Sequence, residues 1–215
     1  MLLGHIELTE KQKNFFEKMI LPSNRITFLR GPAGSAKTFL SVYCALTLLN
    51  KNPDLKILYL RSAVESASKG LGFLKGDIDD KFAPYMVPLE DKIEELLNGY
   101  EKDELKKRGV LEAMPINFLR GQSWRDKIVI IDEAQNMTRA ELVTAITRIG
   151  NNTKIFICGD TRQSDIKSND FENICELFND EMSVEKGIIN LSFLKKDIMR
   201  DKILSFIIDK LDGNV

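Results

Sequence analysis

The octapeptide Gly31 to Thr38, which reads Gly-Pro-Ala-Gly-Ser-Ala-Lys-Thr, constrains the fold of this chain more than any other feature. A short apolar run, Arg25 to Arg30, precedes it, and an almost continuously apolar stretch, Lys37 to Leu49, follows it. This order predicts a strand, a glycine-rich turn and a buried helix. Glycines let the backbone of such a turn wrap closely around phosphate oxygens, while its amides and the helix N-terminus face the negative charge. The sequence therefore predicts a phosphate-binding loop.

Each residue of this loop has a predicted role. Lys37 would place its charge between the β- and γ-phosphates of a nucleoside triphosphate, and Thr38 would offer its hydroxyl to Mg²⁺. The other nucleotide-binding positions are Gly31, Pro32, Ala33, Gly34, Ser35 and Ala36. Ala36 stands where the pattern G-x-x-x-x-G-K-S/T has its second glycine, so the match fails at one position. We expect the added methyl group to narrow the backbone freedom and to slow or weaken nucleotide handling; a degraded site is the alternative.

Two acids, Asp132 and Glu133, follow a second aliphatic run, Lys127 to Ile131. This is the Walker B arrangement, in which the acids lie at the C-terminal edge of a sheet. Asp132 would hold Mg²⁺ through its water shell, and Glu133 would orient or deprotonate the attacking water. The alternative, two acids that merely end a strand, is disfavoured because the phosphate loop stands upstream.

A third run, Lys154 to Gly159, ends before Asp160-Thr-Arg-Gln163. Ligands of open α/β sheets bind outside the carboxyl ends of the strands, so Gln163 is a candidate sensor of the γ-phosphate or of its attacking water. Gly-Asp-Thr is also good turn chemistry, and a plain turn is the alternative. We assign Lys37, Glu133 and Gln163 to catalysis on these grounds.

Short aliphatic or β-branched runs alternate with helical stretches, which predicts an α/β fold with a mostly parallel sheet and helices on both faces. The six expected strands are Arg25–Arg30, Lys56–Arg61, Val110–Ala113, Lys127–Asp132, Lys154–Gly159 and Ile188–Phe193. With 215 residues the chain fits a single domain, 1–215. Residues 62–109 are rich in glycine, proline and charge and form an insertion after the second strand. We expect this insertion to be mobile and partly helical, and to be the place where a substrate or partner acts.

Two helices have recognisable signals in the sequence. Thr138 and Glu141 stand at capping-box spacing before an apolar helical pattern. Near the C-terminus an apolar stripe would dock a last helix onto the body of the domain. It comprises Met199, Ile203, Phe206, Ile207 and Leu211.

The composition argues against several classes of protein. Apolar runs such as Ile128 to Ile131 are far too short to cross a bilayer, and the first residues lack the pattern of a secretion signal, so we expect no membrane partner and a cytoplasmic location. The cysteines, Cys44, Cys158 and Cys175, are widely spaced and are expected to be reduced structural thiols. His5 has no histidine or cysteine nearby, which disfavours metal binding. The net charge of −1 gives no general attraction for a polyanion.

With these motifs the chain resembles the PhoH family of P-loop ATPases, whose core is similar to the first motor domain of superfamily 1 helicases. The shared motifs are the phosphate loop, Asp-Glu-Ala-Gln at Asp132 to Gln135, and Gly-Asp-x-x-Gln at Gly159 to Gln163. Further stretches that resemble family signatures are Arg61–Glu65, Lys69–Asp77, Pro84–Leu89 and Met114–Gly121. The resemblance implies a RecA-like fold, ATP and Mg²⁺ as cofactors, and ATP hydrolysis.

The resemblance also implies roles for residues near the two ends of the chain. Gln12 is similar to the glutamine that reads adenine in the family; the alternative is that Thr9 and Gln12 form a helix capping box. Arg200 corresponds to a family arginine that would reach a neighbour's γ-phosphate in trans, and the alternative is a surface arginine beside Asp201. The role in trans requires the homo-oligomer, a hexameric ring, that the resemblance implies.

Family analogy further implies RNA or single-stranded DNA as a polymer partner. Local support is limited to Arg120, Arg125 and Lys127 around Trp124, a grouping that could stack a base; the alternative is a tryptophan that covers part of the core. Two function classes stay open: an oligomeric ATPase stimulated by nucleic acid, and an ATP-gated binding module with slow or vestigial hydrolysis. Glu133 favours the enzyme, and the lack of an Asn-Lys-x-Asp signature favours ATP over GTP. The motor motifs disfavour a small-molecule kinase, while helicase or ribonuclease activity is undecided.

Overall fold

The computed structural model describes residues 6–62, 78–119, 123–160 and 170–198, and beyond them Ile203, Phe206, Ile207 and Lys210. Its helices and strands are, in chain order, α1 (Glu10–Ile20), β1 (Ile26–Arg30), α2 (Lys37–Lys51), β2 (Lys56–Arg61), α3 (Ile78–Leu96), α4 (Gly99–Arg108), β3 (Leu111–Pro115), β4 (Lys127–Asp132), α5 (Arg139–Ile146), β5 (Lys154–Gly159), α6 (Asp170–Leu177), α7 (Glu181–Glu185) and β6 (Ile188–Ser192). All six expected strands are present. The bounds of β2, β4 and β5 agree with the prediction residue for residue.

The strands form one sheet in the order β3-β2-β4-β5-β1-β6, and every neighbouring pair is parallel. The predicted α/β class with a parallel sheet is therefore confirmed. Parallel sheets are buried on both faces, which is why a strand such as β4 reads as the continuous aliphatic run Ile128 to Ile131. Because the strands are parallel, their carboxyl ends lie at one edge of the sheet, where the segments after β1, β4 and β5 meet.

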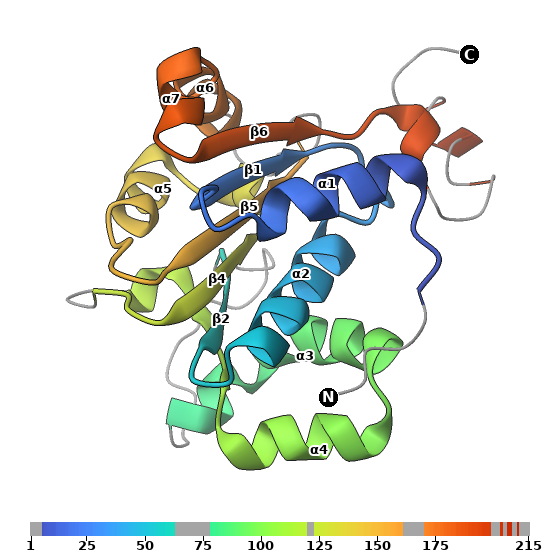
Figure 1. Cartoon of the computed structure of the whole chain (residues 1–215), viewed down its shortest axis with the longest axis vertical. Coiled ribbons are helices and arrows are strands. Elements are labelled where there is room, and N and C mark those ends of the chain that lie inside the picture. Colours follow the sequence, from blue (N-terminus) through green and yellow to red (C-terminus); the bar gives the residue numbers. More distant parts are fainter. Residues whose placement is uncertain are drawn as a thin grey trace.

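Helices cover both faces of the sheet, as predicted (Figure 1). On one face α1, α2, α3 and α4 enclose a core that includes Leu46 of α2 and Tyr59 of β2. On the other face α5 and α6 enclose a second core that includes Leu142 and Phe171. The helix α2 is apolar almost all round because it contacts α1, α3 and the sheet.

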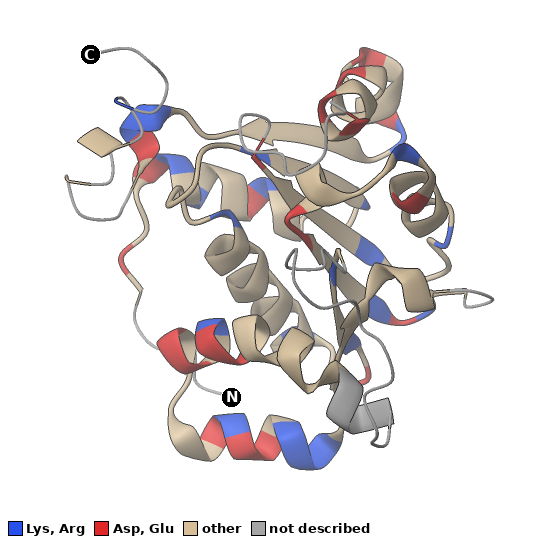
Figure 2. Ribbon diagram, turned by 180° about the vertical axis from the view of Figure 1, so that it is seen from behind, with Lys and Arg blue, Asp and Glu red and all other residues tan. Residues whose placement is uncertain are grey.

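The part of the insertion that the structure describes is helical, as expected, and is packed into the body of the domain. Leu89 of α3 and Leu105 of α4 are buried in the same core as α2. Both helices carry charged residues of both signs (Figure 2), and Lys102 of α4 pairs with Glu90 and Glu94 of α3. The two helices are thus a structural part of the domain.

Pro84 and Pro88 lie inside α3, although prolines in this segment suggested interruptions. A proline in a helix interior costs about 3 kcal/mol, because it removes a backbone hydrogen bond and crowds the preceding turn. Burial of an aliphatic side chain contributes roughly 1.5–3 kcal/mol, and α3 buries Leu89, Ile93 and Leu96. The tertiary packing of α3 therefore offsets a local preference that opposes the helix.

The predicted start of α5 is confirmed. The Thr138 hydroxyl accepts a hydrogen bond from the backbone N–H of Glu141, and the Glu141 carboxylate accepts one from the backbone N–H of Thr138. Both bonds satisfy backbone donors that a helix N-terminus would otherwise leave unpaired.

The prediction that an apolar C-terminal stripe docks onto the domain is wrong for the residues that the structure describes. The relative exposures of Ile203, Phe206 and Ile207 are 62%, 55% and 43%. Met199 and Leu211 lie outside the described residues. A helical apolar pattern sets which side chains share a face, but not whether another element covers that face.

Two further expectations, on membrane spans and on the cysteines, concern the described residues. No helix among them combines the length and the apolar character needed to span a bilayer. Cys44, Cys158 and Cys175 are free and buried, in agreement with the prediction of reduced thiols. His5 lies outside the described residues.

Candidate nucleotide site

A cavity of about 500 Å³ opens at the carboxyl edge of the sheet. The phosphate loop and the start of α2 line it with Ala33, Gly34, Ala36, Lys37, Thr38 and Phe39. Asp132 and Glu133 at the end of β4 and Gly159 at the end of β5 complete this side. The segments that the sequence singled out therefore meet in one cavity of the size typical of small-molecule sites.

The backbone of the phosphate loop adopts conformations that favour glycine. Gly31 has φ +155° and Gly34 has φ +77°. A Cβ atom at Gly31 would lie 2.7 Å from the Cβ of Phe193, so a larger residue would have to displace this neighbour. Ala36 is also left-handed, with φ +64° and ψ +23°, a region that costs a non-glycine residue roughly 1–2 kcal/mol. The one departure from the loop pattern is thus a strained residue.

Lys37 bends back across its own loop. Its Nζ donates hydrogen bonds to the backbone carbonyl oxygens of Gly31, at 2.7 Å, and Pro32, at 2.9 Å. An ammonium group has three donors, so one remains available to a phosphate oxygen. The loop therefore holds a positive charge at the wall of the cavity.

Asp132 is buried and is hydrogen-bonded through both carboxylate oxygens. Oδ1 accepts from the Thr38 hydroxyl at 2.8 Å, and Oδ2 accepts from the Tyr59 hydroxyl at 2.5 Å. Burial, reinforced by the Asp132 carboxylate, raises the pKa of Tyr59 well above its usual value of 10, so the phenol stays a donor at neutral pH. The structure brings Thr38 and Asp132 together, as the sequence predicted.

The donor set at Thr38 and Asp132 fits Mg²⁺. A hydroxyl and a carboxylate are hard oxygen ligands, and magnesium in nucleotide sites is held by one or two such side chains together with substrate phosphates and waters. Among the described residues no group of three or more histidine, cysteine, aspartate or glutamate side chains forms a cage for a metal ion. With one hydroxyl and one carboxylate from the protein, a magnesium ion here would share its coordination with phosphates and waters.

Glu133 belongs to a hydrogen-bonded chain that links the three predicted segments. Glu133 itself is left-handed, with φ +53°, and its Oε2 accepts from Gln135 Nε2 at 2.6 Å. Gln135 Oε1 accepts from the backbone N–H of Asp160 at 3.0 Å, and Asp160 Oδ2 accepts from the backbone N–H of Ala33 at 3.0 Å. The Arg61 guanidinium lies 3.8 Å from Glu133 Oε1. The carboxylate is thus oriented from β4, β5 and the phosphate loop at once.

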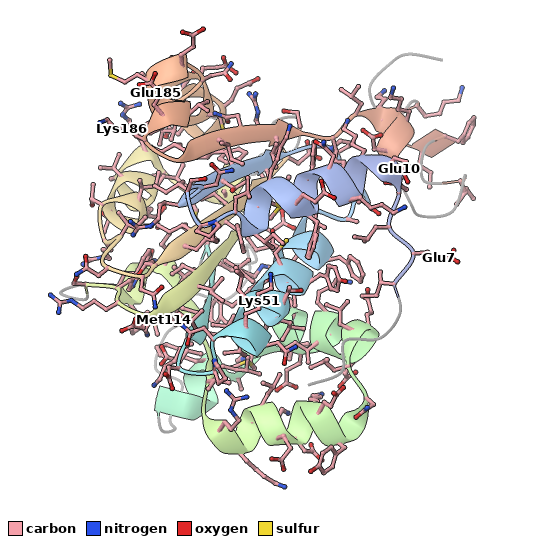
Figure 3. The ribbon with its side chains drawn as sticks, viewed as in Figure 1. Glu7, Glu10, Lys51, Met114, Glu185 and Lys186 are labelled. Carbon is pink, nitrogen blue, oxygen red and sulfur yellow. The ribbon has the colours of Figure 1, made fainter. Side chains whose placement is uncertain are left out.

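Gln12 serves the capping box and also lines the cavity. Its Oε1 accepts from the backbone N–H of Thr9 at 3.0 Å, and its own N–H donates to the Thr9 hydroxyl at 3.3 Å. Its Nε2 makes no hydrogen bond with any residue that the structure describes, and the side chain lines the cavity beside Glu7, which lies on the segment leading into α1 (Figure 3). The two roles are therefore compatible, because the cap uses one lone pair of Oε1 and leaves the second lone pair and Nε2 available.

Gln163, Arg200 and the predicted base-stacking group around Trp124 have other outcomes. Gln163 and Arg200 lie outside the described residues. Trp124 is fully buried against the second core, so the surface that would stack a base is absent there. Lys127 pairs with Glu112 at 2.5 Å. The hypothesis of a base-stacking tryptophan is therefore wrong, because its neighbours in sequence are charged while its neighbours in space are apolar.

The residues of the site that sequence reasoning missed include four from β2 and α3. Tyr59 and Arg61 of β2 contact Asp132 and Glu133, and Lys92 and Glu95 of α3 line the cavity. A tyrosine inside an otherwise aliphatic strand is a signal for Tyr59, because a buried phenol needs a hydrogen-bond partner. No local pattern points to the two residues of α3, since only the packing of the insertion brings them there.

The sheet order, the loop between β1 and α2, and the acids after β4 define a P-loop nucleoside triphosphatase fold of the RecA-like type. Among solved structures, the large terminase from a thermophilic bacteriophage is similar, with a TM-score of 0.58 over 96% of this chain and 50% of the terminase chain, at 12% identity. The complex of the same terminase with ADP gives a TM-score of 0.56 over 95% of this chain and 50% of that chain, also at 12% identity. This likeness concerns the fold alone.

The chain belongs to the PhoH-like protein family, whose family model, "PhoH-like protein", matches residues 6–212. It is 35% identical over 192 residues to the PhoH-like protein of Bacillus subtilis, and the aligned part covers 88% of this chain and 59% of the relative. It is 33% identical over 189 residues to Protein PhoH of Escherichia coli, which covers 85% of this chain and 52% of the relative. The chain thus spans about half the length of the curated relatives it matches. The resemblance inferred from the motifs is confirmed.

Proposed function

We propose that this chain binds ATP together with Mg²⁺ and hydrolyses it. The observation that carries the proposal is the hydrogen bond between Thr38 and Asp132 beside Lys37, in one cavity at the carboxyl edge of the sheet. A magnesium triphosphate requires these residue types in this setting. When bound, Mg²⁺ would neutralise phosphate charge and polarise the γ-phosphoryl group.

The phosphate loop would hold the triphosphate through its backbone and Lys37. The amides of residues 31–36 and the N-terminus of α2 provide partial positive charge, and Lys37 adds a full charge. Thr38 would turn a lone pair of its hydroxyl to the metal, while Asp132 would accept hydrogen bonds from metal-bound water. The Thr38 hydroxyl could keep its hydrogen bond to Asp132, because its lone pairs stay available to a metal.

Glu133 would orient and deprotonate the attacking water. Its Oε2 is held by Gln135, while its Oε1 accepts no hydrogen bond from the described residues. A carboxylate with one fixed oxygen and one available oxygen suits a general base, because the fixed oxygen sets the direction of the other. We propose Gln163 as a further contact to the γ-phosphate or to this water.

The base of the nucleotide would lie toward α1. The free amide nitrogen of Gln12 would donate to N7 of adenine, and the second lone pair of its carbonyl oxygen, beside the one that caps α1, would accept from N6. Phe39 adds an apolar ring to the same cavity. We therefore propose ATP in preference to GTP, with Gln12 as the adenine contact.

The proposed polymer partner is RNA or single-stranded DNA, and the proposed assembly is a homo-oligomer in the form of a hexameric ring, in the cytoplasm. Membership of the PhoH-like family supports these proposals by analogy. In such a ring Arg200 would reach the γ-phosphate bound to a neighbouring copy. An activity that is constant on dilution to the monomer would argue against this arginine role.

A nucleotide-gated binding module is the second candidate function. The strained backbone at Ala36 favours it, because strain in the phosphate loop weakens the grip on the triphosphate. In this candidate ATP binding orders a surface for a partner, and hydrolysis is slow or vestigial.

Phosphate release, measured with and without RNA and single-stranded DNA, tests the proposed activity. We expect wild-type protein to release phosphate, Glu133→Gln to bind ATP with little turnover, and Lys37→Ala to bind ATP weakly. Glu133→Gln changes one atom of the side chain and keeps its shape, so it is the matched control for binding. Absence of turnover in the wild type under every condition, with ATP binding intact, would leave the gated module.

A further inference from the structure

The Walker B aspartate is held by a group that the phosphate-loop motifs do not include. The Tyr59 hydroxyl donates to Asp132 Oδ2 at 2.5 Å, while Thr38 donates to Oδ1 at 2.8 Å. Tyr59 is fully buried, and Asp132 has a relative exposure of only 6%. The two carboxylate oxygens therefore have different surroundings: one faces the core side of the sheet and the other faces the phosphate loop.

The position of Tyr59 follows from the sheet. β2 and β4 are parallel neighbours, with Arg61 opposite Asp132, so Tyr59 lies two residues before the register partner of the aspartate. Residues two apart on a strand point to the same face. The ring is fixed in the core among α2 and the neighbouring strands, which leaves the hydroxyl little freedom to leave the carboxylate.

We propose that Tyr59 is a positioning residue for magnesium: its hydroxyl fixes one oxygen of Asp132, so that the other oxygen is presented beside Thr38 to the metal and its waters. Hydrogen bonds from a hydroxyl to a carboxylate are short and strong. The distance of 2.5 Å between Tyr59 Oη and Asp132 Oδ2 is typical of such a bond. Groups that orient a metal ligand from behind set its rotamer, and their loss typically weakens metal affinity about 10–100-fold.

This inference rests on the proposed binding of a magnesium nucleotide. The alternative is a purely structural role, in which Asp132 only satisfies the hydrogen-bonding need of the buried Tyr59 hydroxyl. The two roles differ in the affinity for magnesium that they predict. If the role is purely structural, the nucleotide and magnesium bind equally well without the hydroxyl.

The test is a calorimetric titration of ADP at a series of Mg²⁺ concentrations on wild-type protein and on Tyr59→Phe. The variant keeps the ring and removes only the hydroxyl. We expect about a 10-fold or greater increase in the Mg²⁺ concentration that half-saturates the tight mode of ADP binding. The affinity for ADP without Mg²⁺ should stay unchanged, which a general disruption of the site would not produce.

Tyr43→Phe is the matched control, because it removes a phenol hydroxyl on α2 whose ring packs on Phe16, 5.0 Å between centroids, and does not contact Asp132. We expect this control to behave as the wild type. Should Tyr59→Phe fail to fold, Tyr59→Met offers another apolar side chain without a hydroxyl for the same titration.

The outcomes separate the inference from the function on which it rests. An unchanged Mg²⁺ requirement in folded Tyr59→Phe overturns the positioning role and leaves the proposed nucleotide site standing. Wild-type protein that binds no ADP with Mg²⁺ present defeats the proposed function and the inference together.

Discussion

Replacing Ala36 by glycine should stabilise this protein, although glycine in place of alanine usually destabilises. Ala36 occupies the left-handed region at φ +64°, which costs roughly 1–2 kcal/mol in a residue with a Cβ atom. Glycine removes this cost but adds conformational entropy to the unfolded chain, worth about 0.4–1 kcal/mol. The difference is a net gain of about 1 kcal/mol in the free energy of unfolding.

The gain should be visible in thermal unfolding. For a chain of 215 residues, 1 kcal/mol corresponds to a shift of about 2–4 °C in Tm. The assay is calorimetry or circular dichroism on wild-type protein and Ala36→Gly, with and without ADP and Mg²⁺. A second readout is ATP affinity, which should be unchanged or tighter, because glycine lets the loop approach the phosphates without strain.

Ala83→Gly is the control for this prediction. Ala83 is exposed within α3 and is not among the residues with positive φ, so glycine there should lower stability by roughly 0.5–1 kcal/mol. An Ala36→Gly protein that unfolds at the wild-type temperature or below it, as Ala83→Gly should, would refute the argument from strain.

Three further predictions concern stability and its dependence on pH. Thr138→Ala should cost about 1 kcal/mol and lower Tm by about 2–4 °C in thermal unfolding, because it removes the cap of α5. Gly31→Ala should lower both Tm and ATP affinity, because the added methyl group would lie 2.7 Å from the Cβ of Phe193. Gly99→Ala is the control: its methyl group would meet no atom within 4 Å, so Tm and ATP affinity should not fall. Burial lowers the pKa of Lys154 to about 8 in the folded protein, below its value of 10.5 in the unfolded chain. Between these two values the unfolded chain binds more protons than the folded protein. The contribution of Lys154 to the free energy of unfolding therefore rises with pH between about 8 and 10.5. The stability of Lys154→Met relative to the wild type, measured by urea unfolding, should therefore fall over that range, and a constant difference would contradict the assigned pKa.

The sequence predicted best those features that depend on local signals. Strands buried on both faces must be aliphatic throughout, so β4 could be delimited from Lys127 to Asp132 without knowledge of its neighbours. The start of α5 was equally local, because Thr138 and Glu141 are only three residues apart. The phosphate loop combined both kinds of signal, a strand before it and a helix after it.

Features that depend on distant contacts escaped prediction. Tyr59 and Asp132 are 73 residues apart, and only the placing of β2 beside β4 brings them together. Trp124 has charged neighbours in the sequence, yet the segment returns to pair with Ile149 beside a buried core. The helix α3 forms through two prolines because its apolar face is buried, which no window of local propensity can report.

The sheet order explains why the end of β5 matters to both halves of the site. β5 lies between β1 and β4, so the phosphate loop and the Walker B acids start two strand spacings apart, roughly 10 Å. Thr38 reaches Asp132 across this gap because the first turns of α2 pack on the end of β5, where Ser41 Oγ lies 3.1 Å from Cys158 Sγ. Asp160 then lies where it binds Ala33 through its carboxylate and Gln135 through its backbone N–H. A displacement at the end of β5 must therefore move a hydrogen bond of the phosphate loop and one that orients Glu133. Under the proposed function this would couple the binding of the phosphates to the position of Glu133 as the proposed general base.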